Sequence, residues 1–112
     1  MPLDRKKKLY YDILQAVSSI EEFIDDIDSF VEYKKDRKTK SAVERQLAII
    51  GEAVKHIKQI DANELIKHHS NIISFRNLLI HSYDSIDDEM VWNTIKKHLP
   101  PLKDEVVEKL KN

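Results

Sequence analysis

The sequence contains no cysteine, one glycine, three prolines and few aromatic residues, which are one tryptophan, four tyrosines and three phenylalanines. Without cysteine the chain forms no disulfide, thiolate zinc site or cysteine nucleophile, which is consistent with a reducing compartment. Low glycine and proline contents argue against a turn-rich β fold and favour long helices.

Long hydrophobic runs are also missing, since no stretch approaches the roughly 18 apolar residues that a transmembrane helix needs. The basic residues at positions 5–8 are followed by mixed apolar and acidic residues rather than by the apolar region of a signal peptide. Charged residues make up 35% of the chain but sum to a net charge of -1, so any contact with RNA must be local. We therefore expect a soluble cytoplasmic protein with one domain spanning residues 1–112.

Apolar residues recur at intervals of three or four along most of the chain, which predicts amphipathic helices. We expect helices over residues 5–33, from about 39 to 60, over 61–69, over 71–82, and from about 85 to 110. Asp61 and Glu64 have the spacing of a capping box, which predicts the start of the third of these helices. Pro100 and Pro101 should break or kink the last helix, because proline lacks the amide donor. The predicted fold is all-α, a small antiparallel bundle of four to five helices.

Two local features of this pattern bear on function. The basic run at residues 34–40 is predicted to be a solvated connection, with Thr39 or Ser41 as the next N-cap and guidance of RNA as the alternative role. Gly51 in a helix interior costs on the order of 1 kcal/mol relative to alanine, which indicates close approach of another backbone. Glu52 lies toward the apolar arc and needs a cationic partner or water, and Arg76 is the candidate partner.

The segment from 76 to 83 carries the side chains best suited to catalysis or phosphate binding. Asn77 and His81 are four apart and share a helix face, while Arg76 and Tyr83, seven apart, share an adjacent face if the helix continues. Arginine suits phosphate and histidine moves protons near neutral pH. Because RNA supplies its own 2′-hydroxyl nucleophile, such residues could cleave it without a metal. A satisfied interface cluster is the alternative interpretation.

The remaining histidines have no carboxylate partner at an evident ligand spacing, so neither a metal site nor a cofactor is predicted. These are His56, His68, His69 and His98. Trp92 is expected in the core rather than as a platform for base stacking.

Arg76, His81 and Tyr83 also match a pattern of Arg, four to six spacers, His, any residue and Tyr. With it, the sequence resembles the HepT-like branch of the HEPN superfamily. Residues 42–53 look like the second-helix signature of that branch, and Ile86-Asp87, Val91-Trp92 and Leu99-Pro100 look like its C-terminal pattern. The resemblance extends from about residue 9 to 110.

The resemblance implies a helical bundle that forms homodimers, with the Arg and His motifs of both protomers lining one cleft. It further implies a ribonuclease toxin whose partner is MntA, a minimal nucleotidyltransferase antitoxin that silences it by transferring AMP from ATP onto Tyr83. Two-fold symmetry would supply two histidines, one as base and one as acid. Tyr83 could instead cap and pack against the helix end.

From the residues we expect His81 to be the general base or acid and Arg76 to clamp the phosphate. Asn77 is expected as an orienting donor and Glu52 as a supporting residue; both roles are inferred from chemistry alone. The leading hypothesis is a metal-independent endoribonuclease acting on tRNA or mRNA. The rivals are a non-catalytic HEPN module that binds nucleotide or the nucleotidyltransferase, and a plain helical dimerisation protein.

Overall fold

The computed structural model describes the backbone of residues 2–111 and the side chains of residues 5–82 and 84–111. This described part consists of helices and turns and contains no strand, which confirms the all-α prediction. The helices are α1 (Pro2–Phe23), α2 (Phe30–Lys35), α3 (Arg37–Ile60), α4 (His69–His81), α5 (Asp88–Asn93) and α6 (Leu99–Leu110). A 3-10 turn, Tyr83–Ser85, follows α4, and a π-helical turn, Thr94–His98, joins α5 to α6.

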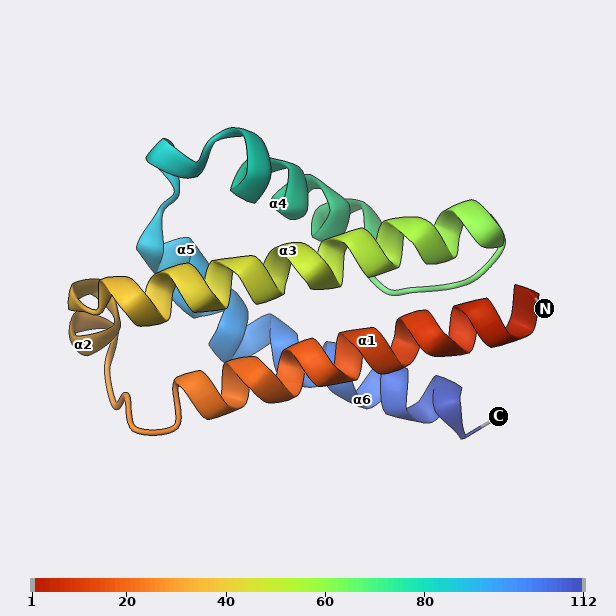
Figure 1. Cartoon of the computed structure of the whole chain (residues 1–112), viewed down its shortest axis with the longest axis horizontal. Coiled ribbons are helices and arrows are strands. Elements are labelled where there is room, and N and C mark those ends of the chain that lie inside the picture. The colour runs from red at the N-terminus through yellow and green to blue at the C-terminus, as the bar shows by residue number, and fades with distance from the viewer. Residues whose placement is uncertain (1, 112) are drawn as a thin grey trace.

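Four long helices make up the body of the molecule (Figure 1). The central helix α3 lies between α1 and α4 and runs antiparallel to both, while α6 packs against α1. The short helices α2 and α5 contact each other at the end where α3 begins, opposite the two chain termini. None of the described helices is both long enough and apolar enough to cross a membrane.

The core is formed by aliphatic side chains that follow the predicted stripes. Its fully buried members include Ile13, Val17 and Ile20 from α1, Val43, Val54 and Ile57 from α3, and Val91 and Val106 from the C-terminal third. Tyr33 of α2 is also fully buried, and its ring centroid lies 5.1 Å from that of Trp92. Trp92 therefore packs against the core, as expected.

The first helix ends at Phe23, although it was predicted to continue to Tyr33. Three aspartates and a serine at positions 25–29 have side chains that compete with helical hydrogen bonds and favour turns. Ser29 then caps α2 by accepting a hydrogen bond from the Glu32 amide at 3.3 Å. The apolar stripe continues across this break because the chain turns and still directs Ile27 into the core.

The basic run at residues 34–40 is helical except at Asp36, so its assignment as a loop was wrong. Asp36 caps α3, where Thr39 or Ser41 was expected, and accepts hydrogen bonds from the Thr39 amide at 3.0 Å and hydroxyl at 2.7 Å. These hydrogen bonds lower the pKa of the Asp36 carboxyl. The residues of this run on either side of Asp36 therefore lie in helices.

The predicted helix over residues 61–69 is absent, and the chain forms turns up to His68. The capping box fails because the Glu64 carboxylate accepts a hydrogen bond from the Tyr10 hydroxyl of α1 at 2.5 Å. Asp61 instead accepts from the Asn63 amide and from Lys6, at 3.1 and 3.0 Å. His68 adopts a left-handed conformation with φ 61°, and α4 begins at the next residue.

The C-terminal helical pattern is interrupted just before the two prolines. The Leu99 amide donates to the Thr94 carbonyl, which widens the turn there. Pro100 then lies in the first turn of α6, where a missing amide hydrogen removes no helical hydrogen bond. The predicted disturbance at the prolines is therefore a π-helical turn that precedes them.

Candidate active site

Gly51 allows helix α4 to lie close against α3. A Cβ atom at this position would be 2.2 Å from Cβ of Arg76 and 3.4 Å from the Ile72 carbonyl oxygen. The close neighbour is therefore chiefly the stem of the Arg76 side chain rather than another backbone. The single glycine of the sequence thus makes room for the arginine of the proposed motif.

The Arg76 guanidinium is held by two neighbours. Its Nη2 atom lies 2.5 Å from Oε2 of Glu52, and its Nη1 donates to Oδ1 of Asn77 at 3.0 Å. The predicted contact between Glu52 and Arg76 is present, and Asn77 joins it. The Arg76 side chain is 17% exposed, so this ion pair is only partly screened by water.

His56 completes this group, although the sequence reasoning passed over it. Its Nε2 lies 3.0 Å from Oε1 of Glu52, so one carboxylate contacts both a histidine and an arginine. The statement that no other histidine has a well-spaced carboxylate was wrong, because Glu52 and His56 are four residues apart on α3. That spacing was the signal available in the sequence.

The arrangement leaves Arg76 with unused donors. Arginine has five N–H groups, of which one donates to Asn77, while Nη2 forms an ion pair with Glu52. The Nε–H of Arg76 has no hydrogen-bond partner among the described residues. Because this Nε is buried, an anion that binds the guanidinium must contact its Nη atoms.

His81 is in a different environment from Arg76. It is the last residue of α4, it is exposed, and it makes no hydrogen bond or ion pair with any described residue. It lies five positions after Arg76, which places it about 140° further around the helix. The exposed Asn77 and His81 share a face, as predicted, but among the described residues no hydrogen bond or ion pair joins His81 to the Arg76 group.

Helical geometry does not continue from His81 to Tyr83. Ser82 lies outside α4, and Tyr83 begins the 3-10 turn, so Arg76 and Tyr83 do not share a helix face. The position of the Tyr83 side chain lies outside what the structure describes, and its proposed modification is therefore untested.

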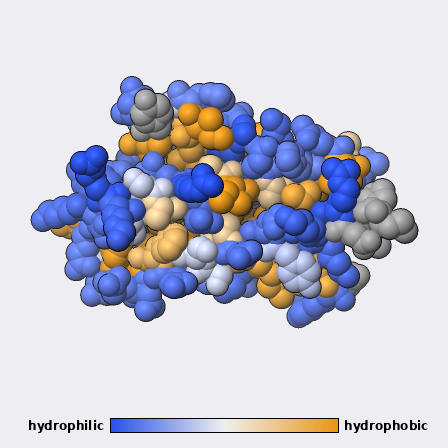
Figure 2. All heavy atoms as spheres, viewed as in Figure 1, coloured by the Kyte–Doolittle hydropathy of each residue, from blue (hydrophilic) through white to orange (hydrophobic). Residues whose placement is uncertain are grey.

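The apolar residues of the motif are buried to different degrees. Leu79 is buried, Leu78 is half-buried, and Ile80 is 42% exposed beside His81. Figure 2 shows hydrophobic side chains at the surface over α4, in a view otherwise dominated by polar residues. Only part of this apolar segment anchors α4 to the core, and the remainder faces outward.

The described residues contain no group of three or more histidine, aspartate or glutamate side chains placed to hold a metal ion. The chemistry available near α4 is therefore that of Arg76, Asn77, Glu52, His56 and His81.

Residues 13–108 match the family described as Ribonuclease HepT-like. The chain belongs to this HepT-like family. The match includes α3, α4 and every residue of the candidate site.

Individual relatives agree with the HepT-like assignment. A protein of Thermococcus cleftensis named "Probable ribonuclease HepT" is 39% identical over 97 residues, which cover 82% of this chain and 84% of the relative. A protein of Methanocaldococcus jannaschii named "Putative RNase MJ1380" is 35% identical, covering 89% and 92% of the two chains. A second one from that organism, "Putative RNase MJ0127", is 34% identical over 100% of this chain and 93% of its own. No solved structure matches the chain at a significant level.

Proposed function

We propose that this HepT-like protein is a metal-independent endoribonuclease and the toxin of a toxin-antitoxin pair. The observation that carries the proposal is the family match over a helix that holds Arg76 against α3 with donors unused and presents His81 unpaired at its end. Ribonuclease names among the relatives support RNA as the substrate.

In the proposed reaction, His81 removes the proton from a ribose 2′-hydroxyl, and the resulting 2′-oxygen attacks the adjacent phosphorus. The bond to the 5′-oxygen breaks, and a second histidine protonates that leaving oxygen. Arg76 stabilises the extra negative charge of the phosphorane. The products are a 2′,3′-cyclic phosphate and a 5′-hydroxyl end, and no metal is required.

One chain supplies a single His81, so we propose that a second copy contributes the other histidine across a two-fold axis. Exposed Ile80, directly before His81, supports burial of this end of α4 in a homodimer. The composite site would then hold Arg76 and His81 twice. Asn77 would orient Arg76 through the hydrogen bond that it already accepts.

Silencing is proposed to occur at Tyr83, two residues after His81. An MntA-type nucleotidyltransferase would direct the tyrosine oxygen onto the α-phosphorus of ATP, with pyrophosphate as the leaving group. The attached adenylate is bulky and anionic, so it would fill the space beside His81 and compete with RNA phosphate for Arg76.

The test is cleavage of purified tRNA and of mRNA in the presence of EDTA, comparing the wild type with His81→Ala. We expect wild-type cleavage with cyclic-phosphate ends, and loss of cleavage in the variant. Wild-type binding without product would favour the non-catalytic module, and equal cleavage by both proteins would refute the role of His81. Treatment with ATP, magnesium and the nucleotidyltransferase should add AMP mass to wild type but not to Tyr83→Phe, and abolish wild-type cleavage.

A further inference from the structure

Basic side chains without a partner are concentrated where α2 meets α3. Residues 34–45 contain six lysines and arginines against two acidic residues, in a chain whose net charge is -1. Five of the six are exposed and make no hydrogen bond or ion pair with any described residue. These five residues are Lys34, Lys35, Arg37, Lys38 and Arg45, and we call them the cationic track.

Many basic residues elsewhere have a partner. Lys6 pairs with Asp61 at 3.0 Å and Lys103 pairs with Glu21 at 3.1 Å. Within the same segment, Lys40 pairs with Asp88 at 3.0 Å on the side of α3 that faces α5. The cationic track therefore concentrates exposed positive charge where α2 meets α3, and among the described residues only Lys38 of the five interacts with a carboxylate, that of Asp36.

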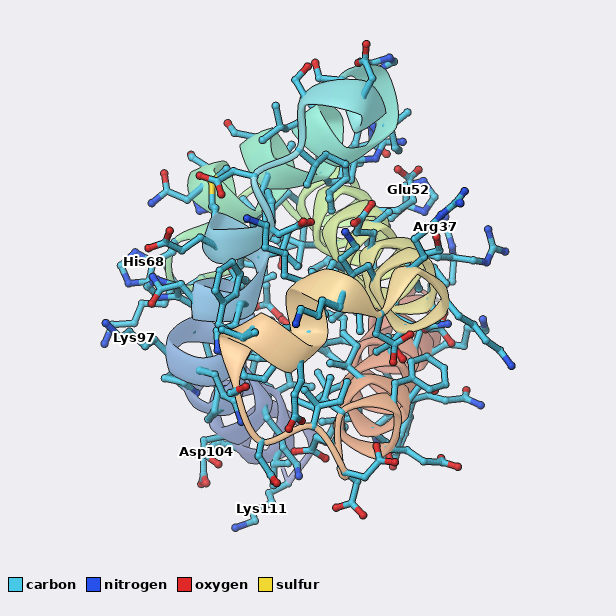
Figure 3. All side chains as sticks on the ribbon, turned by 90° about the vertical axis from the view of Figure 1, so that its left-hand side faces the viewer. Arg37, Glu52, His68, Lys97, Asp104 and Lys111 are labelled. Atoms are coloured by element: carbon cyan, nitrogen blue, oxygen red, sulfur yellow. The ribbon has the colours of Figure 1, made fainter. Side chains whose placement is uncertain are left out.

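The cationic track leads along α3 to the candidate active site. Lys38, Arg45 and Glu52 follow one another at intervals of seven residues, so they lie on one face of the helix. Figure 3 shows Arg37 and Glu52 on the same side of the molecule, with Lys97 on the opposite side. Glu52 is the residue that holds Arg76, so the cationic face ends at the proposed phosphate clamp.

The length of this face fits a short single strand. Fourteen residues of α-helix from Lys38 to Glu52 span about 21 Å at 1.5 Å per residue. Stacked nucleotides advance about 3.4 Å each along a strand, so about six nucleotides cover the distance. Lys38 and Arg45 are about 10 Å apart along the helix, which matches contact with phosphates separated by about three nucleotides.

We propose that the cationic track binds the backbone of single-stranded RNA and guides it along α3 to Arg76. The proposal rests on the proposed ribonuclease function and identifies a substrate-binding surface outside the reacting residues. Lysine and arginine that contact phosphates contribute affinity independent of base sequence, because phosphates are the same at every position. The track therefore promotes binding without selecting a cleavage site.

The test uses the His81→Ala protein, in which RNA stays intact, and a labelled 12-nucleotide RNA without secondary structure. Fluorescence anisotropy measures affinity across a salt series, with and without the added pair Lys38→Gln and Arg45→Gln. Loss of two phosphate contacts should lower the salt-dependence slope by about 1.4 and the affinity roughly 25-fold at 0.1 M salt. The matched control is Lys67→Gln with Lys97→Gln, which removes two exposed charges away from the track.

Length provides a second measurement, because RNA must reach from Arg76 to Lys38 to benefit from the track. The protein with the intact track should bind a four-nucleotide RNA only slightly more tightly than the Lys38→Gln, Arg45→Gln protein does. The difference in affinity should reach its full size above about eight nucleotides. The far-ultraviolet circular dichroism of all variants should match, since the altered residues are exposed.

Equal affinities and slopes for the track and control variants would overturn the proposal. The proposal would also be overturned if the track variant bound RNA as before but no longer bound an acidic protein partner. The surface would then be assigned to that partner. These results are distinct from failure of the proposed function, in which the wild type cleaves no RNA whatever the track variants bind.

Discussion

Arg76 and His81 belong to one helix but occupy contrasting environments. Arg76 lies over Gly51, is 17% exposed at its side chain, and contacts both Glu52 and Asn77. His81 is exposed at the end of α4 and has no polar partner among the described residues. One chain thus positions its arginine in advance, whereas its histidine has yet to meet a proton donor or acceptor.

This contrast indicates that packing within one chain positions Arg76, whereas His81 is left accessible to another molecule. A fixed arginine can stabilise phosphate charge with little reorganisation, which is the main benefit of a preorganised site. An exposed histidine next to exposed Ile80 is accessible to another molecule, which in the proposed reaction is RNA or a second copy. Substitutions at Arg76 and its neighbours should therefore affect both stability and activity, and substitutions at His81 should affect activity alone.

The largest effect is expected for His81→Ala. Loss of a general acid or base should lower kcat by roughly 10²- to 10⁴-fold. The melting temperature should stay within about 3 °C, because surface substitutions without partners usually change stability by no more than about 0.5 kcal/mol. Single-turnover cleavage and thermal melting measure the two quantities, and a marked fall in melting temperature would contradict the description of His81 as unpartnered.

Gly51→Ala should reduce both stability and cleavage. The added methyl group would lie 2.2 Å from Cβ of Arg76, so α4 must shift away from α3. We expect the free energy of unfolding to fall by about 1–3 kcal/mol, as for other overpacked sites, and kcat to fall by roughly tenfold or more as Arg76 moves. Denaturant unfolding and cleavage rates provide the measurements.

Ser41→Ala is the control for this substitution, because Ser41 is an exposed residue of the same helix. Alanine favours helix there and should increase stability slightly. If Gly51→Ala also increased stability and left kcat unchanged, the close contact with Arg76 would have no functional importance.

Glu52→Gln should produce a smaller loss, since it preserves shape but removes the charge that holds Arg76. The ion pair is partly exposed, so we expect about 1 kcal/mol or less in stability. The kcat should fall by about three- to tenfold because the guanidinium is less well fixed. His56→Ala, which leaves the Glu52–Arg76 ion pair in place, should lower kcat less than Glu52→Gln. The reverse order would make His56 the more important residue.

The smallest effect is expected for Glu44→Gln, which alters a second carboxylate on α3. Burial and the nearby Asp88 raise the pKa of the Glu44 carboxyl. A raised pKa in the folded state means that folding favours the protonated acid, so stability falls as pH rises through this pKa. Glu44→Gln should therefore raise the melting temperature modestly at pH 7 and have little effect at pH 4. Equal effects at both pH values would exclude ionisation as the cause.

The helical class could be predicted from apolar spacing, and the Glu52–Arg76 contact from the cost of leaving a carboxylate unpaired near an apolar arc. One error arose where a distant residue determined the local structure, and others arose from local signals that were overlooked. The capping box at Asp61 failed because Glu64 bonds to Tyr10 from α1. The end of α1 at Phe23 was available from the following aspartates, but the continuing apolar stripe obscured it.

The sequence by itself determined the motif from Arg76 to Tyr83, the family, and the existence of the main helices, since residue type and periodicity are local properties. The tertiary structure alone decided that Gly51 makes room for Arg76, that His56 shares Glu52 with it, and that α4 ends at His81. The physical reason is that packing α4 against α3 selects which charges meet, whereas His81, on the outward side of α4, has no polar partner among the described residues.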